Sequence, residues 1–557
     1  MKKKIMSEYL KGFLCCGMAV ALMAGCSDDD SPVNGDGAGD ILAEANMPAR
    51  NPWLAQETYS ITHFNSAQTD AFPYAVKDGV YDVDLERCAQ AWAGPVNLMT
   101  LASTSPDYMW GMSSDRVSYL RVADGRLERL AECALPGVTV RTQEQLVRLT
   151  AAYGSYDALE EAVTSVLGKQ PQMSMANGNY VLCDKENNVY SNAGRKLARY
   201  RLKNEARPED GIEQVGVVDL APHIAGSFTL VGVSMTYDGY LVVAAQKALL
   251  TLTRDLAVVD TYQLPEEQIL TNSISLDERA LYVASNSVQP GGKGLMQKII
   301  CRGGKFSTAA ADGAWQAEYE GGPMAPSIKL GYGTGSTPSL MGFGNDEDKL
   351  VVITDGAKRM NLVAFWRDEI PADAKPAGNG DPRVAGVFSI TCGLPAAEWI
   401  QSEQSVVVGG YDVFVVNNIS SGGGKVNDKI VGVLAIGPVL EGPKGVECVR
   451  WNTRTNEWEA HWTRADISSV SMIPAVSTAS GMVFVDGWYD ATGWEVTGLD
   501  WATGRTRHQV RFGKDNRGNG AYAILQYFPN GDLLFNSVAG PMRIALDETA
   551  RTVAWAH

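Results

Sequence analysis

Few side chains in this sequence have the type and spacing needed for acid–base chemistry, and two of them stand at the ends of one polar stretch. His63 and Asp70 belong to the run THFNSAQTD (residues 62–70). Histidine changes its charge near neutral pH, so His63 could act as a general base whose ring is oriented by Asp70. The same stretch could instead cap or close the fold, and the residues leave both interpretations open. Glu403 is the third candidate catalytic residue.

Glu403 also belongs to a candidate metal site with Asn417 and Asn418. A carboxylate together with amide oxygens suits a hard cation such as Ca²⁺. Other polar residues stand just before apolar runs, where inner strands of a β fold would begin. The candidate cofactor-binding residues of this kind are Asn97, Asn272, Thr337 and Gln404. Small polar residues also begin strands for purely structural reasons, because they satisfy backbone groups there.

Several familiar chemistries lack their motif. The other four histidines show no HxH or HExxH spacing, which argues against a histidine zinc site. The sequence contains no GxSxG and no GxxxxGK[ST], so neither a nucleophile elbow nor a P-loop is expected. No CxxC or CxxCH occurs, and the six cysteines beyond residue 26 allow many disulfide pairings without favouring one. The net charge of -16 argues against a nucleic-acid partner.

The first residues form an export signal. Lysines precede an apolar stretch from Gly12 to Ala24, which is too short to span a bilayer. The stretch ends in LMAGC (22–26), which resembles a bacterial lipobox. The resemblance implies that residues 1–25 are a lipoprotein signal peptide and that Cys26 carries the lipid, including palmitate. Ser27 at the next position, by likeness to proteobacterial sorting, favours the outer membrane.

Residues 26–50 are expected to form an acidic, flexible tether, because they contain few large apolar side chains. The acidic run Asp28–Asp30 fits a soluble linker. It also resembles the surface-export signal of Bacteroidetes lipoproteins. The protein is therefore predicted to be lipid-anchored at the outer membrane, and both the periplasmic and the surface-exposed side stay open.

From about Pro95 onward the sequence consists of short apolar runs broken by Asp-Gly, Asn-Gly and Gly-Gly, which is typical of strands and turns. Helix is predicted at one place, an insertion near 142–167 that breaks near Gly154. Residues 51–557 are predicted to form one all-β domain. Within it, residues 51–94 are expected to close or cap the fold.

A repeat of about 50 residues runs through this domain, each unit pairing an apolar strand, a polar turn and a second strand. Its markers are Asp124, Asn204, Asp255, Gly303, Asp368, Asn452, Asp500 and Asp547. A unit of this length holds four strands, and units arranged radially form a β-propeller. We predict eight blades, with seven as the alternative. The last blade is expected to take its fourth strand from RTVAWA (551–556).

The segment GLDWATGR (498–505) resembles the outer hairpin of the quinoprotein, or PQQ-binding-like, propeller repeat. The resemblance implies the fold of the quinoprotein alcohol dehydrogenase-like superfamily. Enzymes of that kind need Ca²⁺ and PQQ in an acid-lined axial pocket, and many carry a vicinal cysteine pair over the cofactor. The Cys15-Cys16 pair of this chain lies in the signal peptide, which departs from that pattern.

The leading prediction is therefore a lipid-anchored envelope propeller that binds a small ligand or an envelope protein through its axial face or rim loops. Fold alone does not determine function, and the residues do not decide whether the protein is an enzyme. The alternatives are a PQQ- and calcium-dependent dehydrogenase, which would make it a quinoprotein-type oxidoreductase, a calcium-dependent lactonase-like hydrolase, and an outer-membrane assembly scaffold.

Overall fold

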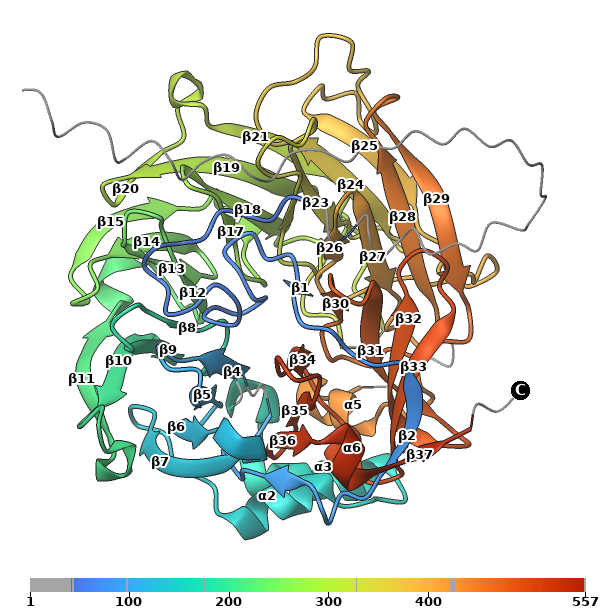
Figure 1. Ribbon diagram of the computed structural model, residues 1–557. Coiled ribbons are helices and arrows are strands. Elements are labelled where there is room, and N and C mark those ends of the chain that lie inside the picture. The colour runs from blue at the N-terminus through green and yellow to red at the C-terminus, as the bar shows by residue number, and fades with distance from the viewer. Residues whose placement is uncertain are drawn as a thin grey trace, which may run out of the picture. The chain divides into compact units, whose positions relative to one another are not determined.

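The computed structural model describes residue 42 and residues 45–96, 99–174, 176–326, 328–420 and 426–554. The described residues form eight mainly antiparallel sheets arranged around a common axis (Figure 1). We number these sheets as blades 1 to 8 in the order of their innermost strands. The predicted eight-bladed, all-β propeller is confirmed. The signal peptide, Cys26, Asn97 and most of the tether lie outside the described residues.

Blades 1 to 4 occupy the first half of the ring. Blade 1 contains β4 (Met99–Ala102), β5 (Tyr108–Met112), β6 (Arg116–Arg121) and β7 (Glu128–Ala134). Blade 2 contains β8 (Leu182–Cys183), β9 (Val189–Ala193), β10 (Lys196–Leu202) and β11 (Ile212–Asp219). Blade 3 contains β12 (Leu230–Met235), β13 (Leu241–Ala245), β14 (Ala248–Leu252) and β15 (Val258–Gln263). Blade 4 contains β16 (Gln268–Ile269), β17 (Ser275–Leu276), β18 (Ala280–Ser287), β19 (Gly294–Arg302), β20 (Lys305–Ser307) and β21 (Trp315–Tyr319).

Blades 5 to 8 complete the ring. Blade 5 contains β22 (Ser339–Met341), β23 (Leu350–Thr354), β24 (Asn361–Trp366) and β25 (Val384–Ser389). Blade 6 contains β26 (Val407–Gly409), β27 (Asp412–Val416), β28 (Val446–Asn452) and β29 (Glu457–Arg464). Blade 7 contains β30 (Ala475–Ser477), β31 (Met482–Tyr489), β32 (Gly493–Asp500) and β33 (Thr506–Gly513). Blade 8 contains β34 (Gln526–Tyr527), β35 (Leu533–Ser537) and β36 (Gly540–Ile544).

Burial along the strands follows their distance from the axis. The middle strands β13 and β14 are buried at every position, because both of their faces pack against neighbouring blades. The outer strand β29 is exposed or half-buried throughout and is rich in charged and polar residues. This gradient explains why the inner runs of each repeat are continuous in Val, Leu and Ile.

The segment GLDWATGR forms the turn between β32 and β33, as its resemblance implied. The carboxylate of Asp500 accepts hydrogen bonds from the backbone N–H and the hydroxyl of Thr503, at 2.9 and 2.7 Å. Gly504 follows with a φ of 69°, a conformation that favours glycine. The indole of Trp462 in blade 6 donates to the carbonyl of Trp501 at 2.8 Å. The turn therefore also fastens blade 7 to blade 6.

The ring closes differently from the sequence prediction. The fourth strand of blade 8 is β3 (Ala89–Gln90), which pairs with β36 from the other end of the chain. The predicted fourth strand, RTVAWA, contributes β37 (Ala550–Val553), which pairs instead with β2 (Gly79–Val83) at the edge of blade 7. Because β2 also pairs with β33, N-terminal residues extend two blades. With an N-terminal strand in the last blade, backbone hydrogen bonds join the two ends of the ring, which a C-terminal fourth strand would not do.

Residues 59–72 cross the axis of the ring, and we call them the axial strap. Inner strands of six blades each donate a backbone N–H to it. The N–H groups of Ala102, Cys183, Leu276, Leu340, Val408 and Val476 donate to the carbonyls of Tyr59, Ser60, Ser66, Ala67, Thr69 and Asp70, respectively. The strap ends in β1 (Ala71–Phe72), which runs parallel to β30. The strap therefore ties most of the blades to one another at the centre.

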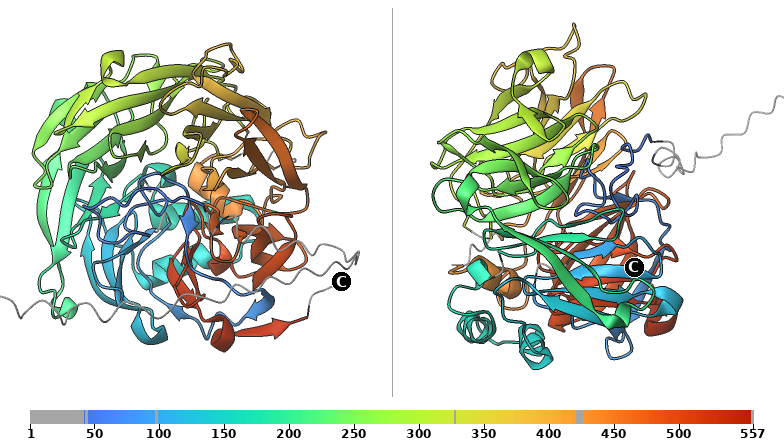
Figure 2. Two further views of the ribbon diagram at one scale, coloured as in Figure 1. Left: turned by 45° about the horizontal axis from the view of Figure 1, so that its top comes forward. Right: turned by 90° about the vertical axis from the view of Figure 1, so that its left-hand side faces the viewer.

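Helices gather on one face of the ring. The predicted insertion forms α2 (Gln143–Thr150) and α3 (Tyr156–Leu167), separated near Gly154 as expected, followed by α4 (Pro171–Ser174). An unpredicted helix, α5 (Lys429–Ala435), packs against α3 and α4. A short α6 (Leu546–Thr549) follows β36. In the right-hand view of Figure 2, α2 to α5 lie on the face opposite the first described residues, which are drawn in dark blue. Among the described helices, none is long and apolar enough to cross a membrane.

Candidate functional site

A cavity of about 250 Å³ lies at the axis, on the face that carries the helices. Its walls come from residues that precede or begin the inner strands of most blades, together with α4 and α5. The apolar lining includes Met99, Leu230, Val231, Leu270, Ile430 and Ile473. The polar lining includes Tyr180, Gln246, Asn272, Glu403, Lys429 and Tyr522. The cavity is therefore mainly apolar, with a few polar groups in fixed positions, as is usual for small-molecule sites.

Glu403 is the one carboxylate of this lining. Both of its carboxylate oxygens are buried, and no side chain in the described part of the chain donates a hydrogen bond to either of them. The backbone N–H of Leu330 is close enough to lower the pKa of this carboxyl group. Burial raises the pKa of Glu403 to about 7, while the positive charges of Lys329 and Lys429 oppose the rise. A buried acceptor without a partner costs about 1–3 kcal/mol. This cost marks Glu403 as a group that is not satisfied by the protein itself.

Lys329 lies behind Glu403 and was not a candidate from the sequence. It is 1% exposed, and its ammonium donates to the side-chain oxygen of Gln401. Burial lowers the pKa of Lys329, whereas Glu403 and Asp355 raise it. Lys429 stands on the cavity wall at the start of α5. Two lysines therefore interact with Glu403, and each also interacts with a second carboxylate, Asp355 for Lys329 and Asp428 for Lys429.

The structure brings His63 and Asp70 together, as their spacing suggested. Nδ1 of His63 lies 2.9 and 2.8 Å from the two oxygens of Asp70, and both side chains are fully buried. Burial raises the pKa of Asp70, while the His63 ring lowers it. The His63 ring stacks on the Tyr180 ring, with 5.7 Å between the two ring centroids. Of these three residues, Tyr180 lines the cavity. The pair therefore stands behind Tyr180 and is not part of the cavity wall.

The strap that holds this pair has an unusual backbone. Five of its non-glycine residues have φ between 56° and 75°: Tyr59, His63, Phe64, Gln68 and Asp70. Such conformations cost free energy and persist only where the surroundings enforce them. The hydrogen bonds from six blades supply that enforcement. The contact between His63 and Asp70 thus helps to hold the strained backbone of the axial strap at the centre of the ring.

The residues of the predicted cation site lie close together, and their amide oxygens already accept hydrogen bonds. The side-chain oxygen of Asn417 accepts from the backbone N–H of Gln401 at 3.1 Å, and that of Asn418 accepts from the N–H of Glu403 at 3.1 Å. Both amide oxygens therefore accept a hydrogen bond, and the positive charge of Lys329 interacts with the carboxylate that would bind the cation. The described residues contain no cluster of three His, Cys, Asp or Glu side chains that could hold a metal ion.

Three of the four candidate cofactor residues lie near the axial cavity: Asn272 and Thr337 both contact the Tyr180 side chain, and the backbone of Gln404 accepts from Ser336, the neighbour of Thr337. Asn272 lines the cavity, where its side-chain oxygen accepts from the Tyr180 hydroxyl at 3.0 Å and its amide nitrogen has no partner among the described residues. Thr337 and Gln404 are buried and are not part of the cavity lining. Asn97 lies outside the described residues. One of the four is thus placed where it could contact a ligand.

The mouth of the cavity is held by Asp428, the residue that precedes α5. One of its oxygens caps the helix by accepting from the N–H groups of Ile430 and Val431, at 2.9 and 3.3 Å. The other accepts from the N–H of Gln172 in α4 at 3.0 Å. Met173, also in α4, is 58% exposed at this mouth. Asp428 therefore joins α4 to the start of α5, and both of these segments line the cavity.

Replacing Asp428 with alanine should loosen α4 and lower the free energy of unfolding by about 1 kcal/mol, the usual value of a helix cap. Limited proteolysis should then cut the chain near residues 168–177 several times faster than in the parent. Ser155→Ala is the matched control, because Ser155 caps α3 without bonding to another segment at the mouth. Equal cleavage rates for the two variants would contradict the role given to Asp428.

The six cysteines of the described chain are unpaired thiols: Cys88, Cys133, Cys183, Cys301, Cys392 and Cys448. Burial raises the pKa of each thiol. None of them lines the axial cavity. A raised pKa keeps a thiol protonated and poorly nucleophilic. Four of these residues therefore act as small apolar side chains in the core, and the half-buried Cys88 and Cys133 pack against it.

Comparison with known proteins identifies the fold of this chain but does not assign it to a family. No family model matches the chain. An uncharacterized protein of Archaeoglobus fulgidus is 29% identical over 345 residues, which are 60% of this chain and 64% of that protein. The chain thus spans less than two thirds of that relative.

Two solved structures are similar. The quinohemoprotein alcohol dehydrogenase from Comamonas testosteroni aligns with a TM-score of 0.51 at 11% identity, covering 89% of this chain and 79% of that one. A europium-containing methanol dehydrogenase aligns with a TM-score of 0.48 at 9% identity, covering 86% and 89%. At 11% identity the first likeness shows the fold alone. The chain is an eight-bladed propeller with the fold seen in quinohemoprotein alcohol dehydrogenase.

Proposed function

We propose that this protein binds a small hydroxylated organic molecule in its axial cavity. The observation that carries the proposal is the buried carboxylate of Glu403, which no side chain satisfies and which has only the backbone N–H of Leu330 near it. The amide nitrogen of Asn272, on the same lining, is a donor that also lacks a partner in the described residues. A hydroxyl group can donate to a carboxylate and accept from an amide. One ligand bearing hydroxyl groups would therefore satisfy both residues.

The rest of the cavity narrows the ligand class. The apolar walls favour a molecule that also carries hydrocarbon. Lys329 and Lys429 disfavour an amine or a metal cation beside Glu403, because like charges repel at this distance and burial weakens screening. The ligand we propose is therefore neutral or weakly acidic. Alcohols, diols and small sugars are the classes to test.

The residues of the axial cavity do not fit the calcium and PQQ site of a quinoprotein dehydrogenase. A quinoprotein dehydrogenase needs a calcium site rich in oxygen ligands. This cavity offers one carboxylate beside two ammonium groups, and the amides nearest to that carboxylate are already engaged. The dehydrogenase alternative consequently rests on the fold alone, and a calcium-dependent hydrolase meets the same objection. No particular contact favours the assembly-scaffold alternative.

Titration of the full chain in detergent with a panel of alcohols, diols, sugars and amines tests this proposal. Calorimetry and thermal unfolding should both report saturable binding of at least one hydroxylated class and none of the amines. A preference for amines, or saturable binding of Ca²⁺ that raises the melting temperature, would contradict it. Lack of binding by every hydroxylated class would also contradict it.

We also propose that the protein is anchored to the outer membrane through lipid on Cys26. The support is the lipobox-like run LMAGC after a short apolar segment. Two or more acyl chains give stable anchoring, whereas one chain holds only marginally. In cells fed labelled palmitate, the parent should carry the label and partition into detergent, and Cys26→Ala should do neither. Equal labelling of both would contradict the anchor.

A further inference from the structure

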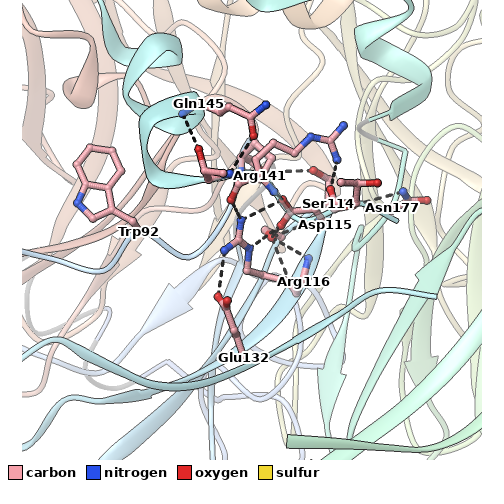
Figure 3. A network of polar contacts seen from close by, with 12 residues as sticks. Trp92, Ser114, Asp115, Arg116, Glu132, Arg141, Gln145 and Asn177 are labelled. Carbon is pink, nitrogen blue, oxygen red and sulfur yellow. Dashed lines mark hydrogen bonds and ion pairs between the residues drawn. The ribbon is translucent and has the colours of Figure 1, made fainter. Parts of the chain in front are cut away.

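A second cavity, of about 220 Å³, lies between blade 1 and the start of the helical insertion. Its lining differs in kind from that of the axial cavity. Trp92, Arg116, Arg129, Glu132, Arg141 and Gln143 line it. Figure 3 shows the Trp92 ring on one side and the column of Arg116, Glu132 and Arg141 on the other, with α2 above. Three guanidinium groups from separate segments thus meet around one small space.

Arg116 is locked in place and neutralised. Two of its nitrogens, Nε and Nη2, donate to the carboxylate of Asp115 at 2.8 and 3.1 Å. Nη1 donates to Glu132 at 3.0 Å, and Nη2 also donates to the backbone carbonyl of Arg141. Asp115 is fully buried and accepts in addition from the backbone N–H of Arg141 at 2.8 Å. This network holds the floor of the cavity rigid.

Arg129 and Arg141 each have guanidinium N–H groups that donate to no protein atom among the described residues. Arg129 uses only Nη1, which lies 2.6 Å from both the carbonyl of Trp92 and a carboxylate oxygen of Glu132. Arg141 uses Nε and Nη1 on two backbone carbonyls. A guanidinium has five N–H donors. In the described residues, the Nη2 group of each side chain therefore has no protein acceptor.

The charges around the cavity do not cancel. Three guanidinium groups face two carboxylates, Asp115 and Glu132, which leaves one net positive charge. The chain as a whole carries a net charge of -16, so the positive charge at this cavity has the opposite sign to that of the whole protein. Planar guanidinium donors suit carboxylate and phosphate oxygens, which accept several hydrogen bonds at once.

We infer that this second cavity binds a small oxyanion, a carboxylate or phosphate group, through Arg129 and Arg141. The anion would bring the local charge to neutrality and accept from the unused Nη2 groups. Glu132 competes with it, because its carboxylate already accepts from Arg116 and Arg129. The site is separate from the axial cavity, so the inference does not depend on the function proposed above.

The test is calorimetric titration of the full chain with inorganic phosphate and, separately, with citrate, in a buffer free of other oxyanions. We expect saturable binding that Arg129→Gln weakens at least tenfold and Glu132→Gln strengthens severalfold. Arg121→Gln is the matched control, because Arg121 lies on the same blade and pairs with the exposed Asp124. Its affinity should equal that of the parent.

The two anions distinguish the sources of the ligand. Tighter binding of phosphate indicates a phosphorylated ligand, and tighter binding of citrate indicates a carboxylic acid. Absence of saturable binding for both anions would overturn the inference. So would an Arg129→Gln variant that keeps its fold by circular dichroism and binds as well as Arg121→Gln.

Discussion

Asp70→Ala is expected to lower the free energy of unfolding by about 3 kcal/mol, measured by urea denaturation. Asp70 is fully buried and accepts from Nδ1 of His63 at 2.8 Å, and removing one partner of a buried polar pair leaves the other unsatisfied. Alanine would also have to adopt the φ of 56° found at this position, which costs about 1 kcal/mol more. Together these effects weaken the segment that ties the blades together at the axis.

Asp70→Asn is the control for this expectation. Asparagine keeps an acceptor for His63 and tolerates positive φ better than alanine does. It should retain more than half of the lost stability. If Asp70→Ala unfolds at the same urea concentration as the parent, the pairing of His63 with Asp70 in the axial strap does not contribute to the free energy of unfolding. Equal effects of the two variants would instead locate the whole cost in the lost negative charge.

Glu403→Gln is expected to weaken binding of the hydroxylated ligand on the order of 100-fold, measured by calorimetry. A hydrogen bond to a charged group is worth about 1.5–3 kcal/mol, and the amide presents one acceptor oxygen where the carboxylate presents two. The substitution preserves size, so the cavity should keep its shape. Glu398→Gln is the matched control, because Glu398 lies five residues earlier, is exposed and pairs with Lys358. That variant should bind like the parent.

The sequence was sufficient to predict the blades, because each inner strand is a continuous apolar run and each outer hairpin carries a polar turn. The four strands of blade 7 fall where their residues indicated, and Asp500 and Thr503 form the expected turn. The closure of the ring was not predictable in the same way. β3 consists of two residues, Ala89–Gln90, and its pairing with β36 depends on contacts between distant parts of the chain.

The site was predictable in part. Glu403 and Asn272 were recognised as polar residues before apolar runs, and both line the cavity. The metal site stays a prediction. Residue types do not reveal which oxygens the backbone already uses, and the side-chain oxygen of Asn417 accepts a backbone N–H. Lys329 was missed because one lysine in the run SIKL carries no motif, and only its burial makes it unusual.

The helix α5 was missed for a related reason. Its sequence KIVGVLA contains Ile, Val and a glycine, a composition that favours strand over helix. The carboxylate of Asp428 caps its first turn and so supports the helix locally. Its apolar side chains are buried against the helical insertion and the cavity, which is tertiary packing that the local sequence does not record.

The most direct test of the account is the affinity of the hydroxylated ligand as a function of pH. The ionised carboxylate of Glu403 is the acceptor, and burial raises its pKa to about 7. Affinity should therefore rise from pH 5.5 to pH 7.5 in the parent and change much less in Glu403→Gln. The window ends at pH 7.5 because burial lowers the pKa of the neighbouring Lys329 to about 8. An affinity that is level in the parent, or that falls as the pH rises, would show that the carboxylate of Glu403 does not receive the ligand.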